Sequence, residues 1–223
     1  PFYDPMVAKI IAHGRDRDDA IRRLRAALAA TPLLGLKNNG RFLSDLVDHP
    51  AFRKAEMTTT LIDQWLDTSE PLLQAPVPSD DVWRVAALVL SMQHGDSWRS
   101  DSVAAFGFTL QQGDATRAVR VRPDRSGAVD VTLDGITPAT TRMQMLGLQN
   151  GVLRYAVDGV TRSTIAVVDG ATLHLSQGGT NYQFVEVSPF PNADALKDAS
   201  RARSPVAGRV TQVMVAPGDT VQE

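Results

Sequence analysis

The stretch Asp80-Asp81-Val82-Trp83-Arg84-Val85-Ala86-Ala87-Leu88-Val89-Leu90-Ser91-Met92 decides the fold of this chain. Ser79 precedes it as a helix cap, and the two aspartates that open it complement the positive end of a helix dipole. Its apolar residues occupy every face of a helical wheel instead of one stripe. A helix of this kind is normally enclosed by protein, and this segment is too short to span a bilayer. We therefore predict a buried helix over 79–95, ended by Gly95.

The residues that follow this helix alternate between apolar and polar side chains. Val129, Val131 and Leu133 lie on one face of such a strand, and Asn150-Gly151 and Asp158-Gly159 are pairs that tight hairpin turns prefer. We expect about eight antiparallel strands, near 102–111, 116–122, 127–134, 138–147, 151–157, 160–168, 171–177 and 181–187. Such a meander can close into a barrel whose interior must be filled, and the apolar helix needs an enclosure. We therefore predict an antiparallel β-barrel wound around the helix.

The first 66 residues are typical of a mixed α and β structure. The apolar run 2–12 favours a strand, and Asp16 caps a helix that Pro32 ends. The remaining expected elements of this region are a short strand over 33–36 and two helices over 41–47 and 59–66.

Proline-rich and polar segments separate the regions of the chain. Pro71, Pro76 and Pro78 mark a linker, and a second linker follows the predicted barrel. The fold class is thus α+β. The expected organisation is a mixed α and β piece (1–66), a linker (67–78), a helix-in-barrel domain (79–187), a second linker (188–203) and the start of a further β domain (204–223).

The composition excludes several function classes. The chain has 223 residues and a formal net charge of −2, so no global field favours nucleic acid or an anionic membrane, and we expect neither as a partner. It contains no cysteine, which excludes disulfides, thiolate catalysis and cysteine metal sites. The four histidines never stand at the i, i+4 spacing of a helical zinc site, so no metal site is predicted.

Two groups of motifs lie at opposite ends of the chain. The first region contains, in this order, Tyr3-Asp4-Pro5-Met6-Val7-Ala8-Lys9-Ile10, His13-Gly14-Arg15-Asp16-Arg17-Asp18-Asp19-Ala20-Ile21, Gly35-Leu36-Lys37-Asn38-Asn39 and His49-Pro50-Ala51-Phe52. In order and spacing these motifs resemble the C-terminal end of biotin carboxylase domains. The last region matches the biotinyl carrier pattern, which lipoyl domains share, at Pro205, Gly208, Val210, Gly218, Asp219 and Val221. The chain therefore resembles an internal piece of a biotin-dependent carboxylase, and its biotinylated lysine is expected beyond Glu223.

The helix and barrel predicted between these motifs have a counterpart in the resembled family. In the α subunits of propionyl-CoA and 3-methylcrotonyl-CoA carboxylases, this position holds a subunit-docking (BT) domain that contacts the carboxyltransferase β subunit. That domain is a long helix surrounded by an antiparallel barrel, with a hook-like loop between them. Pyruvate carboxylases place a carboxyltransferase domain here and fit poorly. The chain is most similar to the methylcrotonyl type, with the propionyl and geranyl types as alternatives.

The resemblance implies a function for the parent protein. It would be a ligase that carboxylates biotin with ATP, Mg²⁺ and bicarbonate, after which the carboxyl group passes to an acyl-CoA on a partner subunit. The sites for these cofactors would lie upstream of Pro1, so we expect this piece to be inactive alone and to serve subunit docking. Its partners would be the β subunit and other α subunits of a large hetero-oligomer. A bacterial cytoplasm and a mitochondrial matrix both fit.

Four residues are candidates for the functional site. The resemblance places Asp4 near the biotin pocket, which it would help to order; the alternative is a capping or turn aspartate before Pro5. The hook-like loop would fall at about 96–103. Trp98 lies there in a polar context, and exposed aromatic residues often anchor protein interfaces. We therefore predict Trp98, with Asp96 and Arg99, as the partner interface.

Other readings of the same residues remain open. The arginines of 15–25 alternate with aspartates, which favours a solvated helix face over a phosphate site. A second basic group within 117–125 could meet an acidic partner or the phosphates of CoA, but a barrel exterior is favoured. Two rival functions remain: a barrel that itself binds acyl-CoA, and a spacer without a partner.

Overall fold

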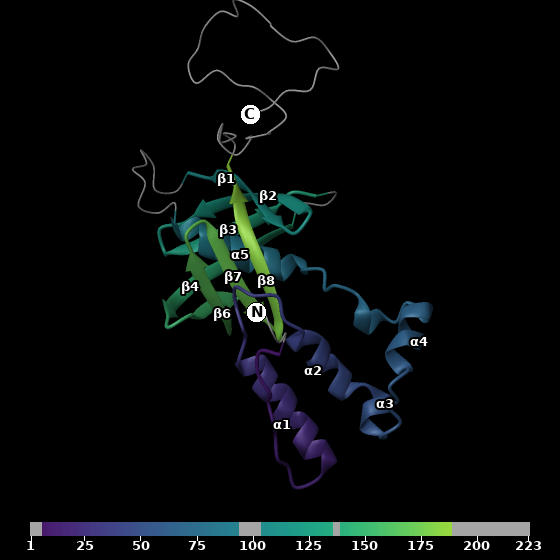
Figure 1. The fold of residues 1–223 in the computed structure, drawn as a ribbon. Coiled ribbons are helices and arrows are strands. Elements are labelled where there is room, and N and C mark those ends of the chain that lie inside the picture. Colours follow the sequence, from purple (N-terminus) through teal and green to yellow (C-terminus); the bar gives the residue numbers. More distant parts are fainter. Residues whose placement is uncertain (1–5, 94–103, 136–138, 189–223) are drawn as a thin grey trace, which may run out of the picture. The chain divides into compact units, whose positions relative to one another are not determined.

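The computed structural model describes residues 6–93, 104–135 and 139–188, and its helices and strands all belong to one compact unit, Pro1–Val187 (Figure 1). The helices are α1 (Arg17–Ala30), α2 (Gly40–Asp48), α3 (Pro50–Arg53), α4 (Leu61–Thr68), the 3₁₀ helix η1 (Pro71–Leu73) and α5 (Asp80–Gln93). The strands are β1 (Phe106–Gln112), β2 (Ala115–Pro123), β3 (Ala128–Leu133), β4 (Ala139–Gln149), β5 (Val152–Val157), β6 (Val160–Asp169), β7 (Thr172–Gln177) and β8 (Thr180–Val187).

The eight strands form a closed antiparallel barrel in which each strand pairs with the next along the chain. The barrel closes where β1 pairs with β8, with Thr109 opposite Val187 and Gln111 opposite Val185. Two of the hairpin turns that join the strands have the positive φ angles expected of Asn-Gly and Asp-Gly pairs, with φ of 51° at Asn150 and 49° at Asp158. The predicted barrel of about eight strands is therefore confirmed.

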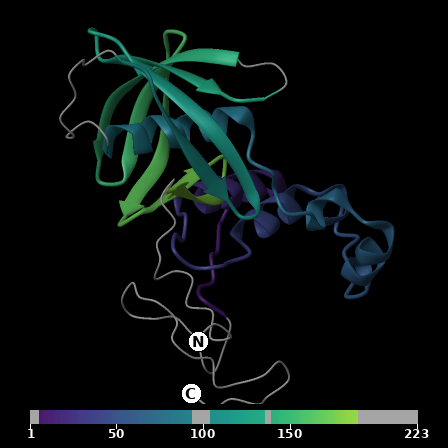
Figure 2. The same cartoon turned by 90° about the horizontal axis from the view of Figure 1, so that it is seen from above.

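Helix α5 runs through the interior of this barrel, as Figure 2 shows. Every residue from 82 to 91 is buried, and Ala86, Ala87 and Leu90 are completely inaccessible. The side chains that enclose the helix come from the inward faces of all eight strands: Leu110, Val119, Val121, Val131, Leu133, Met143, Leu153, Tyr155, Ala166, Leu173, Leu175 and Phe184. The prediction that an apolar helix would be enclosed by hairpins is confirmed, because the inward face of the barrel and the apolar helix bury each other.

The N-terminal region has the three helices that the sequence predicted and lacks the two strands. Asp16 caps α1 by accepting a hydrogen bond from the Asp19 backbone N–H at 2.8 Å, and α1 ends at Ala30, just before Pro32. The expected strands over 2–12 and 33–36 are wrong for the residues described, since 6–12 and 33–36 have no strand structure. A strand needs a partner for its backbone groups, and each of the eight strands described pairs only within the barrel.

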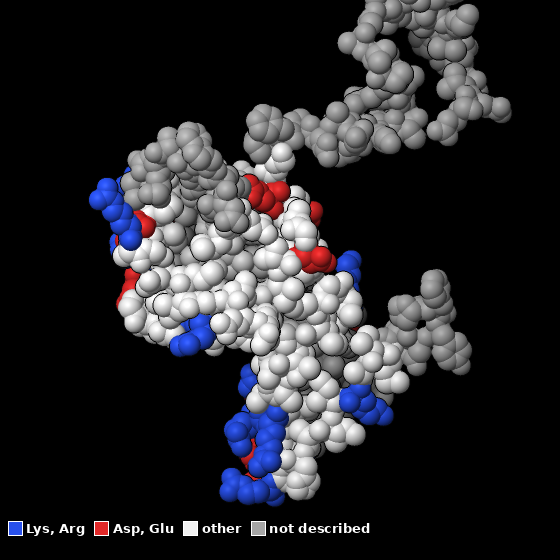
Figure 3. Space-filling model, turned by 90° about the vertical axis from the view of Figure 1, so that its left-hand side faces the viewer, with Lys and Arg blue, Asp and Glu red and all other residues white. Residues whose placement is uncertain are grey.

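The acidic residue Asp19 organises the basic face of α1. Its side chain is 5% exposed, and its carboxylate accepts a hydrogen bond from the Arg15 backbone N–H at 3.2 Å and pairs with the guanidinium groups of Arg22 and Arg23. These hydrogen bonds, that from Arg15 first, lower the pKa of Asp19 to about 2. The arginine side chains remain more than half exposed, and basic residues gather over α1 in Figure 3. A solvated helix face is therefore the correct reading of this arginine run.

Replacing Asp19 by asparagine is expected to remove an acid-sensitive part of the stability. The pKa of Asp19 in the folded chain is about 2, below the ordinary value of 3.8 for an aspartate. The ionised carboxylate therefore stabilises the fold above about pH 4, and this contribution is lost as the pH falls through about 2. Melting temperatures measured from about pH 7 to pH 2 should therefore start higher in the parent chain and converge with those of Asp19→Asn in acid. The exposed Asp114→Asn is the control. Parallel curves for parent and Asp19→Asn would contradict the assignment.

Candidate functional site

The interior of the barrel is packed with side chains and does not form a ligand chamber. A hollow of about 10 Å³ lies between α5 and the strands, beside Val85, Met143 and Tyr155. This space holds at most one water molecule. A ligand the size of an acyl-CoA would have to displace α5 to enter the part of the barrel that the structure describes, which leaves its outer face and its ends as places for a site.

A charge cluster holds the N-terminal end of α5 at one end of the barrel. Arg84 Nη1 lies 3.1 Å from Asp81 Oδ1, and Arg84 Nη2 lies 3.8 Å from Asp80 Oδ2. From the barrel, Arg117 Nη1 reaches Asp80 Oδ1 at 2.5 Å and Arg162 Nη1 lies 3.8 Å from Asp81 Oδ2. The hydrogen bond from Arg117 lowers the pKa of Asp80 below its usual value. These pairs join the start of α5 to β2 and β6.

Sequence reasoning did not identify this cluster. The one feature of the sequence that indicates such a cluster is Arg84, a single charged residue inside an apolar run. In the structure its side chain is only 11% exposed. A cation at such a position needs anionic partners, which the preceding aspartates supply. Arg117 belongs to the second basic group, and the structure gives it an ion pair and a cation–π contact of 5.5 Å to Trp83. Arg120 and Arg122 are exposed, as expected for a barrel exterior.

The opposite end of the barrel is where the chain passes from α5 to β1. Arg117 and Arg162 lie near the starts of β2 and β6, so the charge cluster marks one end and the β4–β5 hairpin lies at the other. Large apolar side chains are exposed near this second end: Met92 (52%), Leu146 (46%), Leu148 (40%) and Val152 (44%). We call these four residues the apolar rim. The register of β4 shifts between Met145 and Gly147, and this bulge lies beside Leu146.

The four predicted site residues fall outside the part of the chain that the structure describes. Asp4 precedes the first described residue, and Asp96, Trp98 and Arg99 belong to the segment 94–103. Gly95, predicted to end the helix, lies there too; the last described residue of α5 is Gln93. The expected start of a biotinyl-type half-domain over 204–223 is likewise outside the described residues.

Neither a metal-binding cluster nor a membrane-spanning helix occurs among the described residues. They contain no group of three or more histidine, cysteine or acidic side chains that could hold a metal ion. None of their helices combines the length and the apolar character that crossing a bilayer requires.

Comparison with known proteins identifies both halves of the compact unit. Residues 1–64 match the family described as "Biotin carboxylase C-terminal domain". Residues 63–189, which include α5 and the whole barrel, match the family described as "Methylcrotonyl-CoA carboxylase, alpha-subunit, BT domain". The resemblance inferred from the motifs of the first region and from the helix and barrel is therefore confirmed.

Individual relatives agree with this result. The chain is 29% identical over its whole length to the mitochondrial methylcrotonoyl-CoA carboxylase subunit alpha of Dictyostelium discoideum, covering 35% of that protein. It is 25% identical over its whole length to the mitochondrial propionyl-CoA carboxylase alpha chain of Rattus norvegicus, covering 33% of it. A biotin carboxylase of Halalkalibacterium halodurans is 42% identical over 66 residues, which are 30% of this chain and 15% of that protein.

The chain spans about a third of the length of the α subunits that it matches from end to end. The BT-domain match covers more than half of the chain, and the helix-in-barrel fold agrees with it. The chain therefore belongs to the family of methylcrotonyl-CoA carboxylase α-subunit BT domains.

Proposed function

We propose that the helix and barrel of this chain dock a carboxyltransferase β subunit onto the α subunit of an acyl-CoA carboxylase. The filled interior of the barrel carries this proposal. Since α5 occupies the space where a small barrel would hold a ligand, the domain offers an outer surface and two ends for binding, which suits a protein partner. The rival in which the barrel itself holds acyl-CoA would require that space.

The apolar rim and the segment 94–103 define the proposed docking end. Met92 is the last but one residue of α5, so the segment that carries Asp96, Trp98 and Arg99 begins at the rim. Interfaces combine an apolar centre with aromatic and arginine anchors. The rim offers exposed apolar side chains, and the sequence that follows Met92 contains Trp98 and Arg99. We propose Trp98 as the anchor, with Arg99 and Asp96 as its polar neighbours.

The wider function belongs to the parent protein. We propose that it carboxylates biotin with ATP, Mg²⁺ and bicarbonate and passes the carboxyl group to an acyl-CoA, with 3-methylcrotonyl-CoA as first candidate and propionyl-CoA as the second. The piece 1–66 would complete the biotin carboxylase domain, with Asp4 ordering the biotin pocket. Residues 204–223 would begin the biotinyl carrier after the linker 188–203, and 67–78 would join carboxylase to barrel. In this arrangement the barrel keeps two active sites within reach of one tethered carrier.

The docking proposal predicts direct binding that depends on Trp98. The 223-residue chain should bind an immobilised carboxyltransferase β subunit of the methylcrotonyl type, measured by interferometry, with a β subunit of the propionyl type as a second arm. Truncating a central interface aromatic typically costs about 2 kcal/mol or more, so Trp98→Ala should weaken binding by about 30-fold or more. Arg99→Ala should weaken it less, and Lys9→Ala, which removes an exposed cation of the N-terminal region, should leave it unchanged.

The same measurement separates the rivals. A chain that binds neither β subunit would favour the spacer. Calorimetry with 3-methylcrotonyl-CoA tests the other alternative: micromolar binding that survives Trp98→Ala would favour a barrel that holds the acyl-CoA itself.

A further inference from the structure

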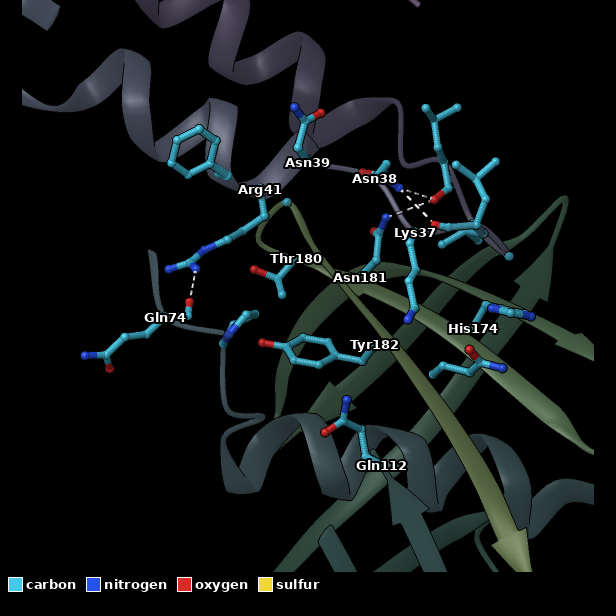
Figure 4. Close-up of a pocket in the computed structure, with 18 of the residues that line it drawn as sticks. Lys37, Asn38, Asn39, Arg41, Gln74, Gln112, His174, Thr180, Asn181 and Tyr182 are labelled. Carbon is cyan, nitrogen blue, oxygen red and sulfur yellow. Dashed lines mark hydrogen bonds between the residues drawn. The ribbon is translucent and has the colours of Figure 1, made fainter. Parts of the chain in front are cut away.

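A pocket lies where the N-terminal region meets the outer face of the barrel. Its volume is about 790 Å³, within the range of small-molecule sites in proteins. Figure 4 shows residues from the loop before α2, from the segment after η1 and from β1, β7 and β8 converging on it. We call it the junction pocket.

One set of polar side chains builds the walls of the junction pocket. Asn181 of β8 donates a hydrogen bond to the Leu33 carbonyl at 3.1 Å, and Asn38 donates to the same carbonyl at 3.0 Å. Arg41 donates to the Gln74 carbonyl at 2.7 Å and pairs with Asp45 at 2.6 Å. These contacts tie the loop before α2 to the barrel and the segment after η1 to α2, so the cavity is held open by hydrogen-bonded walls.

A second set of polar side chains lines the cavity but does not join its walls by hydrogen bonds. Lys37, Gln112, His174 and Tyr182 line the pocket, and their side chains have no hydrogen-bond or ion-pair partner among the described residues. In Figure 4 the Lys37 side chain extends past Asn181 towards Tyr182 and His174. An ammonium group, an imidazole, an amide and a phenol hydroxyl thus line one pocket without a protein partner among the described residues.

The charges of the lining favour an anion. None of the twenty described residues that line the pocket is acidic. The charge of Arg41 is balanced by Asp45, whereas that of Lys37 has no counter-ion among the described residues. Leu34, Phe42 and Leu72 add apolar side chains to the wall. A ligand that matches this lining has an anionic head group and an apolar body.

We propose that the junction pocket binds a small organic oxyanion, a molecule with one phosphate or carboxylate group on an apolar body. Lys37 would hold the head group, with the Tyr182 hydroxyl and the His174 imidazole as further donors. The leucine and phenylalanine side chains would cover the body. This site lies beside β8 and the loop before α2, and it does not depend on the docking function.

Three probes with the same hexyl tail and different head groups test the proposal: hexyl phosphate, heptanoate and hexanol, each titrated into the 223-residue chain by calorimetry. Hydrogen bonds to charged groups contribute about 1.5–3 kcal/mol, so at least one anion should bind about 10-fold or more tightly than hexanol. The tighter anion identifies the head group as phosphate or carboxylate. Backbone amide shifts in NMR spectra should change within 33–42 and 180–183.

Variants assign the interaction to named side chains. Lys37→Met should weaken anion binding by about 10-fold or more and leave hexanol unaffected, whereas Lys37→Arg should retain binding. The exposed Lys54→Met is the matched control and should behave like the parent chain. Tyr182→Phe removes only a hydroxyl group and should cost a few-fold, which guards against a folding defect in Lys37→Met.

Three outcomes would overturn the proposal. They are the absence of binding by both anions, equal binding of hexanol and the anions, and anion binding that Lys37→Met and Tyr182→Phe leave unchanged. None of them bears on β-subunit binding, so the two proposals fail independently.

Discussion

Replacing Ala87 by aspartate should lower the free energy of unfolding by about 4–5 kcal/mol, a large part of what a domain of this size possesses. Ala87 lies in the middle of α5 and is completely buried inside the barrel. A carboxylate there would lie among the apolar side chains of the barrel interior, and Arg84, one turn earlier in α5, already pairs with Asp80 and Asp81. The loss should appear in urea denaturation followed by circular dichroism, as a lower midpoint.

The control for this substitution is Gln93→Asp, at the exposed end of the same helix. It introduces the same side chain into the same element, so it separates burial from helix propensity. The two variants should differ by about 3 kcal/mol or more. If Ala87→Asp unfolded at the same urea concentration as Gln93→Asp, α5 would not be enclosed, and the docking proposal would lose its structural basis.

Replacing Trp83 by alanine should cost about 3–5 kcal/mol. The Trp83 side chain is 2% exposed, and its ring meets that of Phe184 edge-on, with centroids 5.0 Å apart and planes at 75°. The Arg117 guanidinium lies over the same ring at 5.5 Å. The substitution would leave a large cavity between α5 and β8 and would remove both ring contacts. Each of these contacts stabilises the fold in addition to the burial of the ring.

Trp83→Phe distinguishes the contributions, because it keeps an aromatic ring at this position and restores much of the volume. It should recover more than half of the loss seen in Trp83→Ala. Met92→Ala, which truncates an exposed side chain of the same helix, should change the unfolding free energy by less than about 1 kcal/mol. A cost for Trp83→Ala no larger than that of Met92→Ala would contradict the packing described for this end of the barrel.

Some properties of the chain could be read from local patterns. The apolar run around Leu88 has no polar face, so it needed an enclosure, and the alternating strands offered one. Asp16 and Ser79 both cap their helices as expected, Asp16 through the Asp19 N–H and Ser79 through the Val82 N–H at 3.5 Å. These features depend on residues close together in sequence, which is why they are visible there.

The expected strands in the N-terminal region show the limit of such patterns. The run 6–12 is apolar, but Met6 is 62% exposed and Ile11 is 84% exposed in the structure, and no strand there pairs with it. A strand is defined by its partner, and periodicity within one segment does not say whether a partner exists. The pairing of the strands therefore could not be inferred from the run itself.

The sequence alone determined that an apolar helix would be surrounded by hairpins, and its terminal motifs pointed to the carboxylase family, because both signals are local. The tertiary structure alone decided how the barrel closes from β1 to β8 and how Asp80 meets Arg117. It also decided that Lys37 and Tyr182, which lie far apart in the chain, share one pocket. These contacts join residues that are far apart in the sequence. No local pattern predicts them, because each contact depends on how the whole chain folds.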